Sequence, residues 1–269
     1  MSTAVASPLN RILAALPDDQ YARIAPSLDL VELELKQVLF DVDRPIEHVY
    51  FVEDGVASVL GVMADGTAVE TATIGREGMV GLALFHGAEQ TSAQAFCQVP
   101  GRAYRMSAAA FRAEAERQGA LTRMLHRYSH ALLTLIAQSS ACNRLHSMSQ
   151  RCARWLLLTH DRVGADEFAL THQFLSQMLG VRRATVTEAA GALQARRAIT
   201  YTYGRIRVLD RGALEAAACE CYRIIRREFD RLLDGGRSSA PSPLDGVKTS
   251  EDGRTTIGDG TPRAPMPDA

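Results

Sequence analysis

The sequence lacks any stretch that approaches the roughly 18 consecutive apolar residues needed to cross a bilayer. Its amino terminus also lacks the basic segment followed by an apolar one that marks a secretory signal. These absences predict a cytoplasmic protein without a membrane partner. Paired carboxylates, a nucleophile beside a base and a complete set of metal ligands at catalytic spacing are missing too, so the sequence does not predict an enzyme.

Cysteine is scarce, and it is spread over the chain. The 269 residues contain five cysteines, at positions 97, 142, 152, 219 and 221. An odd number at these separations does not form the dense pattern of a small disulfide-stabilised secreted domain, so we expect reduced thiols. Cys97, Cys142 and Cys152 lie in apolar segments, which favours positions in the core.

Two pairs of residues are candidates for metal ligands. His126 and His130 lie one helical turn apart but have no third ligand nearby in sequence, so a solvated or interface position is favoured. Cys219-Glu220-Cys221 brings two thiols together without the spacing of a C-x-x-C redox motif. Packing or surface positions are favoured there over a thiol switch or half of a metal site. The sequence therefore predicts no metal site.

Charge is distributed unevenly, although the net charge is only −1. Residues 1–116 contain 8 Lys and Arg against 16 Asp and Glu, whereas residues 117–150 contain 4 against none and residues 151–233 contain 14 against 9. A whole-chain sum hides this asymmetry between an acidic front and a basic back. The basic half is expected to meet a polyanion, the alternative being a solvated basic face without a partner.

Short β-rich runs separated by turn residues extend from about residue 28 to 106. The segment 31–35 alternates apolar and acidic residues, as half-buried strands do. Asp54-Gly55 and Asp65-Gly66 supply the positive φ angles that tight hairpins require, and Pro100-Gly101 marks a further turn. These features predict a β-roll or small barrel.

A long helix is predicted next, because apolar residues recur at three- and four-residue spacing from about Leu121 to Leu145. A helix of roughly 25 to 30 residues is about 40 Å long, too long for one small β domain to cover. Its free apolar face is therefore expected to pack against a second copy of the chain. The alternative is a helix that lies across its own domain.

The segment from Leu170 to Asp210 carries the strongest functional pattern. Thr171 can cap a helix that ends before Gly180, where a sharp turn between helices favours a residue without a β-carbon. A second helix follows from Arg183, with apolar residues inward and polar residues outward. Residues 199–208 are typical of a hairpin, so the whole predicts a winged helix-turn-helix.

These patterns predict an α+β fold in four parts. The parts are a β-roll domain (1–115), a dimerisation helix (116–146), a winged helix-turn-helix domain (147–233) and a disordered tail (234–269). The helix of the third part is expected to begin after Ser147, because Ser147 to Gln150 has the form of a capping box. The tail is rich in Gly, Pro, Ser, Thr and Asp and has almost no aliphatic residues to bury.

The sequence Thr171-His172-Gln173, continuing through Gly180-Val181-Arg182-Arg183-Ala184-Thr185-Val186, resembles the carboxy-terminal domain of the cyclic-AMP receptor and fumarate-nitrate regulator (Crp/Fnr) family. The β-roll, the long helix and the hinge before Arg151 have the same order and spacing, so the resemblance covers residues from about 20 to 222. It implies a ligand-sensing jelly roll, a dimerising helix and a winged helix that binds palindromic DNA and regulates transcription, with RNA polymerase as a further partner.

Both this resemblance and elementary chemistry indicate which residues contact DNA. An arginine on a helix in the major groove can donate two hydrogen bonds to guanine O6 and N7, and Arg183 matches the family's base-reading arginine. Arg182 is assigned to a phosphate; the alternative for both arginines is a solvated helix end. Glu188 stands where the family often has arginine and can accept from cytosine N4, so the target sequence is expected to differ. The other expected contacts are Thr171, Gln173, Thr185, Thr187 and Arg205.

In family members that bind cyclic nucleotides, a Gly-Glu pair holds the ribose and an Arg-Ser or Arg-Thr pair takes the cyclic phosphate. Here Leu82 stands in place of the carboxylate and Thr91 in place of the guanidinium, so charge-assisted binding is lost at both positions. Ile136 replaces a hydroxyl residue that contacts the adenine. Cyclic AMP is therefore not expected as the effector, whose identity stays open. The other residues expected around an effector pocket are Arg76, Glu77, Gly78, Gly81 and Ser92.

The iron–sulfur cluster of the family's oxygen sensors needs several thiolates, typically near the amino terminus, and no cysteine precedes Cys97. No such cluster is expected. The leading interpretation is a homodimeric, sequence-specific transcriptional regulator bound to double-stranded DNA. The alternative is a ligand-binding module that acts through a protein partner, with the winged helix as a docking surface.

Overall fold

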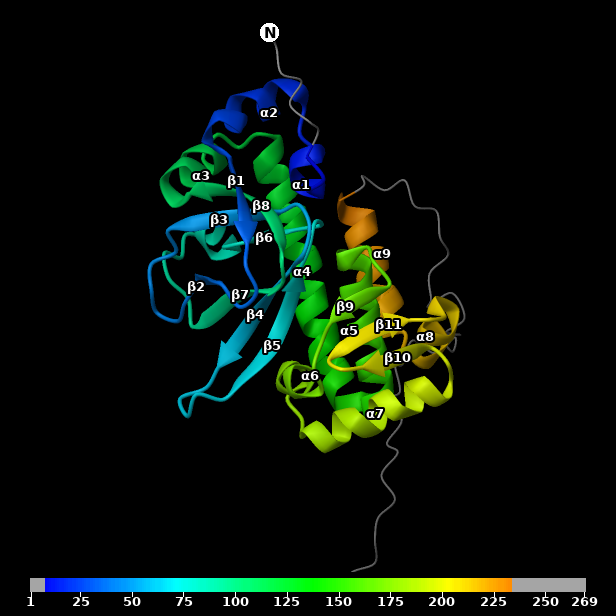
Figure 1. The fold of residues 1–269 in the computed structure, drawn as a ribbon. Helices are drawn as coiled ribbons and strands as arrows, with labels where there is room; N and C mark the ends of the chain where they lie inside the picture. The colour runs from blue at the N-terminus through cyan, green and yellow to red at the C-terminus, as the bar shows by residue number, and fades with distance from the viewer. Residues whose placement is uncertain (1–7, 234–269) are drawn as a thin grey trace, which may run out of the picture. The chain divides into compact units, whose positions relative to one another are not determined.

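The computed structural model describes residues 8–233 (Figure 1). They form two four-stranded sheets, a long helix and a carboxy-terminal helix-turn-helix with a small third sheet, which confirms the predicted α+β class. The predicted disordered tail lies outside the described residues. Within residues 8–233, no helix is both long and apolar enough to span a bilayer.

Two antiparallel four-stranded sheets form the β-roll, with strand orders β1-β8-β3-β6 and β2-β7-β4-β5. Gly55 and Gly66 have φ angles of +83° and +82°, so the predicted hairpin turns are confirmed. The strands are β1 (Asp29–Leu33), β2 (Val38–Phe40), β3 (His48–Val52), β4 (Val56–Val62), β5 (Ala68–Ile74), β6 (Met79–Val80), β7 (Ala93–Val99) and β8 (Gly101–Ser107).

The space between these two sheets is filled by apolar side chains from both of them. Because side chains alternate between the faces of a strand, each strand sends every second residue inward. The core residues between the sheets are Leu33, Leu39, Tyr50, Val52, Ala57, Ile74, Val80, Ala95, Cys97 and Ala103. The interior of the roll is therefore a packed core, and Cys97 lies in it as predicted.

Short helices close the ends of the roll. Buried Asn10 caps the first of them by accepting hydrogen bonds from the backbone of Ile12 and Leu13, while its amide donates to the carbonyls of Val52 and Gly78. This residue therefore fastens the start of the described chain to the roll. The helices are α1 (Arg11–Ala14), α2 (Asp18–Ile24), η1 (Ala25–Ser27), η2 (Leu82–His86) and α3 (Ala108–Ala115).

The predicted long helix is α4 (Ala120–Leu145), with 26 residues. One face packs within its own chain, partly against α9 (Cys221–Leu233), which runs beside it in Figure 1. The other face leaves Leu133 64% and Ile136 39% exposed. The helix therefore lies across its own domain and keeps an exposed apolar strip, and packing against a second copy of the chain stays a prediction.

The carboxy-terminal part begins at the predicted capping box. Ser147 accepts from the backbone of Gln150, whose side chain accepts from the backbone of Ser147. Strand β9, which pairs with β11, was not predicted, because three residues are too few to show an alternation. The elements are α5 (Met148–Val163), β9 (Glu167–Ala169), α6 (His172–Leu179), α7 (Arg183–Ala195), β10 (Ile199–Thr202), β11 (Arg205–Val208) and α8 (Arg211–Ala217).

Candidate functional site

Local sequence signals position helix α7. Thr171 caps α6 by accepting from the backbone of Phe174 at 3.0 Å, and Gly180 ends α6 with a φ of +63°. The chain therefore turns sharply into α7, as predicted. The apolar stripe of α7 is buried, and it consists of Val186, Ala189, Ala190 and Leu193. The opposite, polar face is left outside.

The amino-terminal end of that polar face is basic. Arg182 and Arg183 are exposed, and within residues 8–233 neither guanidinium has a hydrogen bond or an ion pair. Arg182 is the residue before the helix and supplies no side-chain cap. Glu188, one to two turns further along, is exposed as well, whereas Thr185 is half-buried. The structure thus leaves Arg182, Arg183 and Glu188 all exposed in the first half of α7 or at its start.

Thr187 is less available than predicted. Its hydroxyl donates to the carbonyl oxygen of Arg183 at 3.1 Å, so it accepts from Nδ1 of His172, which lies 3.0 Å away. The His172 ring stacks on Tyr201 with 4.0 Å between the centroids. Burial, with a smaller contribution from Arg183, lowers the pKa of His172, which favours a neutral ring. The Thr187 hydroxyl therefore has no proton left to donate to a phosphate, while its methyl group stays exposed.

Thr171 and Gln173, the predicted backbone contacts, are exposed but line a cleft of about 570 Å³. The facing wall of this cleft comes from the β-roll, with Val38, Leu60 and Phe96 among its residues. Phe96 meets Phe174 of α6 edge to face, with 6.2 Å between the ring centroids. The structure therefore presents these two residues less openly than the arginines of α7.

The wing is the hairpin of β10 and β11, which turns at Tyr203 and Gly204. Tyr203 is fully exposed at the tip, and sequence reasoning did not select it. Arg205 is exposed as predicted but pairs with Glu167 of β9 at 2.6 Å, and Arg207 pairs with the same carboxylate at 2.5 Å. Hydrogen bonds from Arg207 and then Arg205 lower the pKa of Glu167. Ion pairs between exposed side chains of this kind contribute little to stability.

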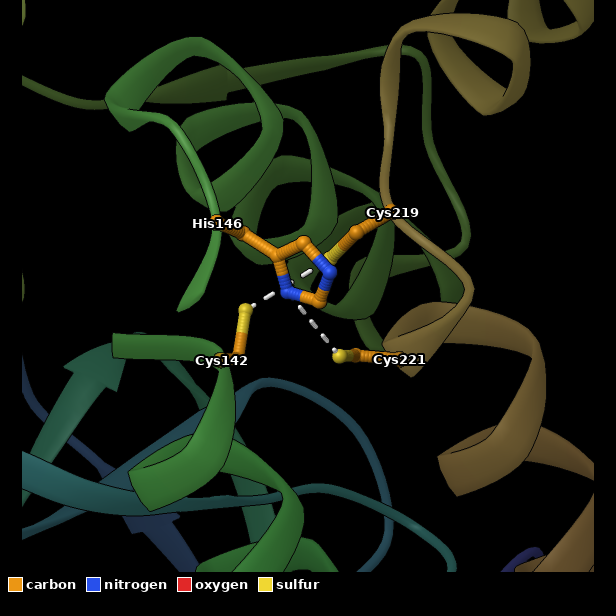
Figure 2. A group of neighbouring side chains, drawn as sticks. All are labelled: Cys142, His146, Cys219 and Cys221. Carbon is orange, nitrogen blue, oxygen red and sulfur yellow. Dashed lines mark hydrogen bonds between the residues drawn. The ribbon is translucent and has the colours of Figure 1, made fainter. Parts of the chain in front are cut away.

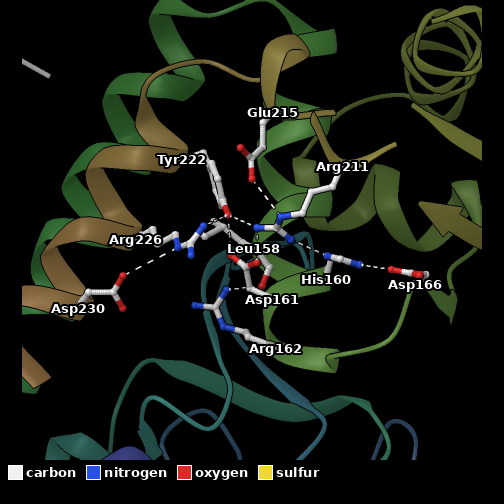
Figure 3. A network of polar contacts seen from close by, with 10 residues as sticks. All are labelled: Leu158, His160, Asp161, Arg162, Asp166, Arg211, Glu215, Tyr222, Arg226 and Asp230. Carbon is white, nitrogen blue, oxygen red and sulfur yellow. Dashed lines mark hydrogen bonds and ion pairs between the residues drawn. The ribbon is translucent and has the colours of Figure 1, made fainter. Parts of the chain in front are cut away.

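A polar network fastens α8 and α9 to α5, and Arg211 lies at its centre (Figure 3). Its guanidinium donates to Asp161 at 2.6 Å and to Tyr222 at 2.5 Å. The Tyr222 hydroxyl donates to the same aspartate at 2.9 Å. Burial first and then Asp161 raise the pKa of Tyr222 to about 12, so the phenol stays protonated and keeps this bond. The two helices after the wing are thereby held to the helix before it.

The predicted effector residues lie in the segment between β5 and β7 (residues 75–92, the β5–β7 segment), apart from Ile136. Glu77 is buried and accepts from Arg162 of α5 at 2.7 Å and from the backbone of Gly75 at 3.1 Å. A β-carbon at Gly75 would lie 2.6 Å from the Arg162 side chain, so glycine permits this close approach. Glu77 is thus occupied by its own chain.

The rest of the β5–β7 segment packs on α4. A β-carbon at Gly78 would meet the ring of Tyr128, whose hydroxyl donates to the carbonyl of Met79 at 3.1 Å. His86 Nε2 lies 3.1 Å from the hydroxyl of Ser129. The segment therefore contacts both the long helix and the helix that follows it.

The structure does not gather the predicted effector residues into one pocket. Arg76 and Glu77 line a cleft of about 400 Å³ together with residues of α1, α5 and α9, including Arg226 and Asp230. The six other predicted residues do not line that cleft: Gly78, Gly81, Leu82, Thr91, Ser92 and Ile136. Leu82 and Thr91 are half-buried, and Ser92 and Ile136 are exposed. Of the predicted set, this cleft is lined by Arg76 and Glu77 alone, and an effector pocket shared by the whole set stays a prediction.

A second contact joins the roll to α5. Trp155 is buried and donates through Nε1 to Glu70 of β5 at 2.6 Å, and Ser58 donates to the same carboxylate at 2.8 Å. Burial raises the pKa of Glu70 to about 7, although both hydrogen bonds oppose the shift. The charge on Glu70 therefore changes near neutral pH.

Sequence reasoning missed one group of residues altogether. Cys142, expected in ordinary core packing, is buried as predicted, but its neighbours are His146, Cys219 and Cys221. The prediction of no metal site weighed Cys219 and Cys221 without Cys142 and His146, because Cys142 lies 77 positions before Cys219 in the sequence. The signal that could have found the group is Cys142 and His146 at a spacing of four.

Comparison with protein-family models gives one match to the β-roll and a second match to the helix-turn-helix part. Residues 30–118 match the family model of the cyclic nucleotide-binding domain, and residues 150–217 match that of the Crp-like helix-turn-helix domain. No curated protein is similar enough in sequence to count as a match.

Three solved structures illustrate the similarity of fold. FixK2 from Bradyrhizobium japonicum is 17% identical with a TM-score of 0.61, and the match covers 71% of this chain and 98% of that one. A transcriptional regulator of the Crp/Fnr family from Eubacterium rectale is 15% identical with a TM-score of 0.60, covering 75% and 94%. The c-di-GMP responsive regulator CLP from Xanthomonas campestris is 13% identical with a TM-score of 0.56, covering 71% and 99%. At such identities the likeness concerns the fold.

Proposed function

The chain belongs to the Crp/Fnr family of DNA-binding transcriptional regulators, and we propose that it acts as a homodimer whose two α7 helices read a palindromic operator. The observation that carries this proposal is the open, basic start of α7, where Arg182 and Arg183 have no partner among residues 8–233. We assign residues 1–115 to a sensor, 116–146 to dimerisation and 147–233 to DNA binding.

Each residue at the DNA interface has a proposed role. Arg183 donates two hydrogen bonds to a guanine, and Arg182 pairs with a phosphate. Glu188 accepts from a cytosine N4, which sets the base preference further along the groove. The remaining proposed contacts are backbone contacts by Thr171 and Gln173, a side-chain contact by Thr185, a methyl contact by Thr187, and a phosphate contact by Arg205 after it leaves Glu167.

The exposed strip of α4 is the proposed dimer seam. Leu133 and Ile136 supply apolar area, and exposed Ala137 and Ser140 lie within one turn of them, where small side chains allow two helices to approach closely. A two-fold axis along this seam would present the two α7 helices to successive major grooves, about 34 Å apart.

We propose that the sensor does not take cyclic AMP through the family's binding residues. Leu82 and Thr91 lack the required charges, and Glu77 is already bound to Arg162. The β5–β7 segment contacts α4 through Tyr128 and α5 through Arg162, so a change in this segment reaches the start of the DNA-binding part directly. We also propose no amino-terminal iron–sulfur cluster and no catalytic activity.

Two further proposals come from the family. RNA polymerase is the proposed protein partner, and the cytoplasm, where a bacterial regulator meets its operator, is the proposed compartment. The competing function is a module that docks on a protein partner through its winged helix and does not read DNA.

Selection of bound sequences from a random duplex pool tests the proposal. We expect enrichment of an inverted repeat whose half-sites are one helical turn apart and each contain a guanine at a fixed position. Binding to the enriched duplex should weaken steeply as salt rises, because phosphate contacts release counterions. A pool that stays random at moderate ionic strength, with a folded protein, would favour the protein-docking function instead.

A further inference from the structure

Four side chains with metal-ligating atoms meet where α4 ends (Figure 2). Cys142, His146, Cys219 and Cys221 each offer one ligand atom, and these atoms all lie within 4.8 Å of one another. The cysteines are buried and His146 is half-buried. The Sγ atoms of Cys142 and Cys219 are 3.5 Å apart, and Nδ1 of His146 lies 3.5 Å from Sγ of Cys221.

The group is built from two segments that are distant in sequence. Cys142 lies in the last turn of α4, and His146 is the residue after the helix, in extended conformation, so its ring can turn back toward the thiol. Cys219 and Cys221 flank Glu220 where the chain passes from α8 to α9. Neither segment alone offers more than two ligands.

The separations suit a single tetrahedral ion. Zinc binds sulfur at about 2.3 Å and imidazole nitrogen at about 2.0 Å, which in a tetrahedron places ligand atoms about 3.5 to 3.8 Å apart. The two pairs at 3.5 Å agree with this spacing, and the remaining pairs lie within 4.8 Å. In an iron–sulfur cluster the four protein ligands are divided among two or four iron atoms, so ligands on different irons stand farther apart than these atoms, which all lie within 4.8 Å of one another. The geometry therefore favours one ion over an iron–sulfur cluster.

Neighbouring polar groups support such a site. Nε2 of His146 lies 3.3 Å from a carboxylate oxygen of Glu220, which turns Nδ1 toward the thiols. The amide of Gln138 donates to Sγ of Cys221 at 3.2 Å. A carboxylate behind a histidine ligand and a donor to a thiolate are recurrent features around bound metals.

We propose that Cys142, His146, Cys219 and Cys221 bind one zinc ion in tetrahedral Cys3His coordination, and that this ion fastens the end of α4 to the junction of α8 and α9. Thiolate and imidazole ligands select zinc over magnesium or calcium. Four protein ligands close the coordination sphere, which is typical of a structural site. Since α5 begins directly after His146, the ion would sit at the hinge between the long helix and the DNA-binding part.

Metal analysis of the full-length protein tests the proposal. We expect one zinc ion per chain in the wild type and in Cys152→Ala, a control that removes a buried thiol outside the group. Zinc affinity should fall at least about 100-fold in Cys219→Ser and Cys221→Ser, and about 10- to 100-fold in Glu220→Gln, which keeps all four ligands. In the wild type, Co²⁺ in place of zinc should give the d–d bands of a tetrahedral site and thiolate charge-transfer absorption.

A wild-type measurement decides the matter even if the cysteine variants do not fold. Removing zinc with a chelator should lower the melting temperature of the wild type by several degrees, because an ion that binds the folded state stabilises it. The proposal is overturned if the wild type binds neither Zn²⁺ nor Co²⁺, if the Co²⁺ spectrum is octahedral, if iron and sulfide are found instead, or if Cys219→Ser keeps full affinity. The proposal of a zinc site does not depend on whether the chain binds DNA.

Discussion

Charged side chains are used in opposite ways in the two functional parts of this chain. At the start of α7, Arg182 and Arg183 are exposed and have no partner among residues 8–233. Beside the β5–β7 segment, Glu77 and Arg162 are buried and paired with each other at 2.7 Å. Exposed guanidinium groups are available to a partner from outside, whereas a buried pair connects parts of the same chain.

The buried pair should show the largest effect of substitution. Glu77→Ala leaves Arg162 charged and unpaired in the interior, so the free energy of unfolding should fall by about 3 to 5 kcal/mol. Urea unfolding measures this change. Arg205→Ala is the matched control, since it breaks an exposed pair and should cost about 1 kcal/mol or less. Equal effects of the two substitutions would remove the contrast between buried and exposed charge.

The exposed strip of α4 should respond next. Leu133→Glu places a carboxylate in the proposed seam, where burial without a partner is unfavourable, so dimer association should weaken by about 3 kcal/mol or more. Sedimentation equilibrium measures the association constant. Arg123→Glu, at an exposed position nearer the start of the helix and outside the seam, is the control and should leave it nearly unchanged. A wild-type chain that is monomeric at micromolar concentration would contradict the proposed dimer.

The contact between Glu70 and Trp155 should make stability depend on pH. The pKa of Glu70 is about 7 in the folded chain against 4.5 for an ordinary glutamate, so between these values the folded state holds more protons than the unfolded state. The free energy of unfolding should therefore fall as pH rises from about 4.5 to 7, by about 1 to 3 kcal/mol, and level off above that range. Glu70→Gln should remove this dependence of the free energy of unfolding on pH, which urea titrations at several pH values measure. An unchanged dependence would mean that another group, and not Glu70, takes up the proton.

The smallest effect is expected at Arg182. Arg182→Ala should weaken binding to every duplex by about 1 kcal/mol and reduce the slope of log affinity against log salt by about 1, because one phosphate contact is lost. Fluorescence anisotropy with specific and random duplexes measures both quantities. A change in base preference without a change in salt slope would reverse the roles assigned to Arg182 and Arg183.

The helix-turn-helix and its wing could be predicted from the sequence, because their signals are local. The Thr171 cap, the turn glycine Gly180 and the capping box of Ser147 and Gln150 each depend on neighbours within a few residues. The hairpin glycines of the β-roll are local in the same sense.

The contacts that define the candidate sites were not predictable in this way, because they join distant residues. Glu77 and Arg162 are 85 positions apart, and Cys142 and Cys219 are 77 positions apart. The pairing of Arg205 with Glu167 could not be predicted, since Glu167 lies on a strand too short to show a pattern. The residue types show which chemical groups the chain contains, but only the folded structure shows which of these groups are in contact.

The most direct test of the central claim combines a protein substitution with a base substitution. In the selected operator, the guanine assigned to Arg183 is replaced by 7-deazaguanine, which lacks the N7 acceptor, and affinity is measured with the wild type and with Arg183→Ala. We predict that each change alone weakens binding by about 1 to 3 kcal/mol, with the larger loss for Arg183→Ala, which removes the bonds to both O6 and N7. Once Arg183 is alanine, the base change should add almost nothing, because the bond to N7 is already gone. Fully additive losses would contradict the claim that Arg183 reads this guanine.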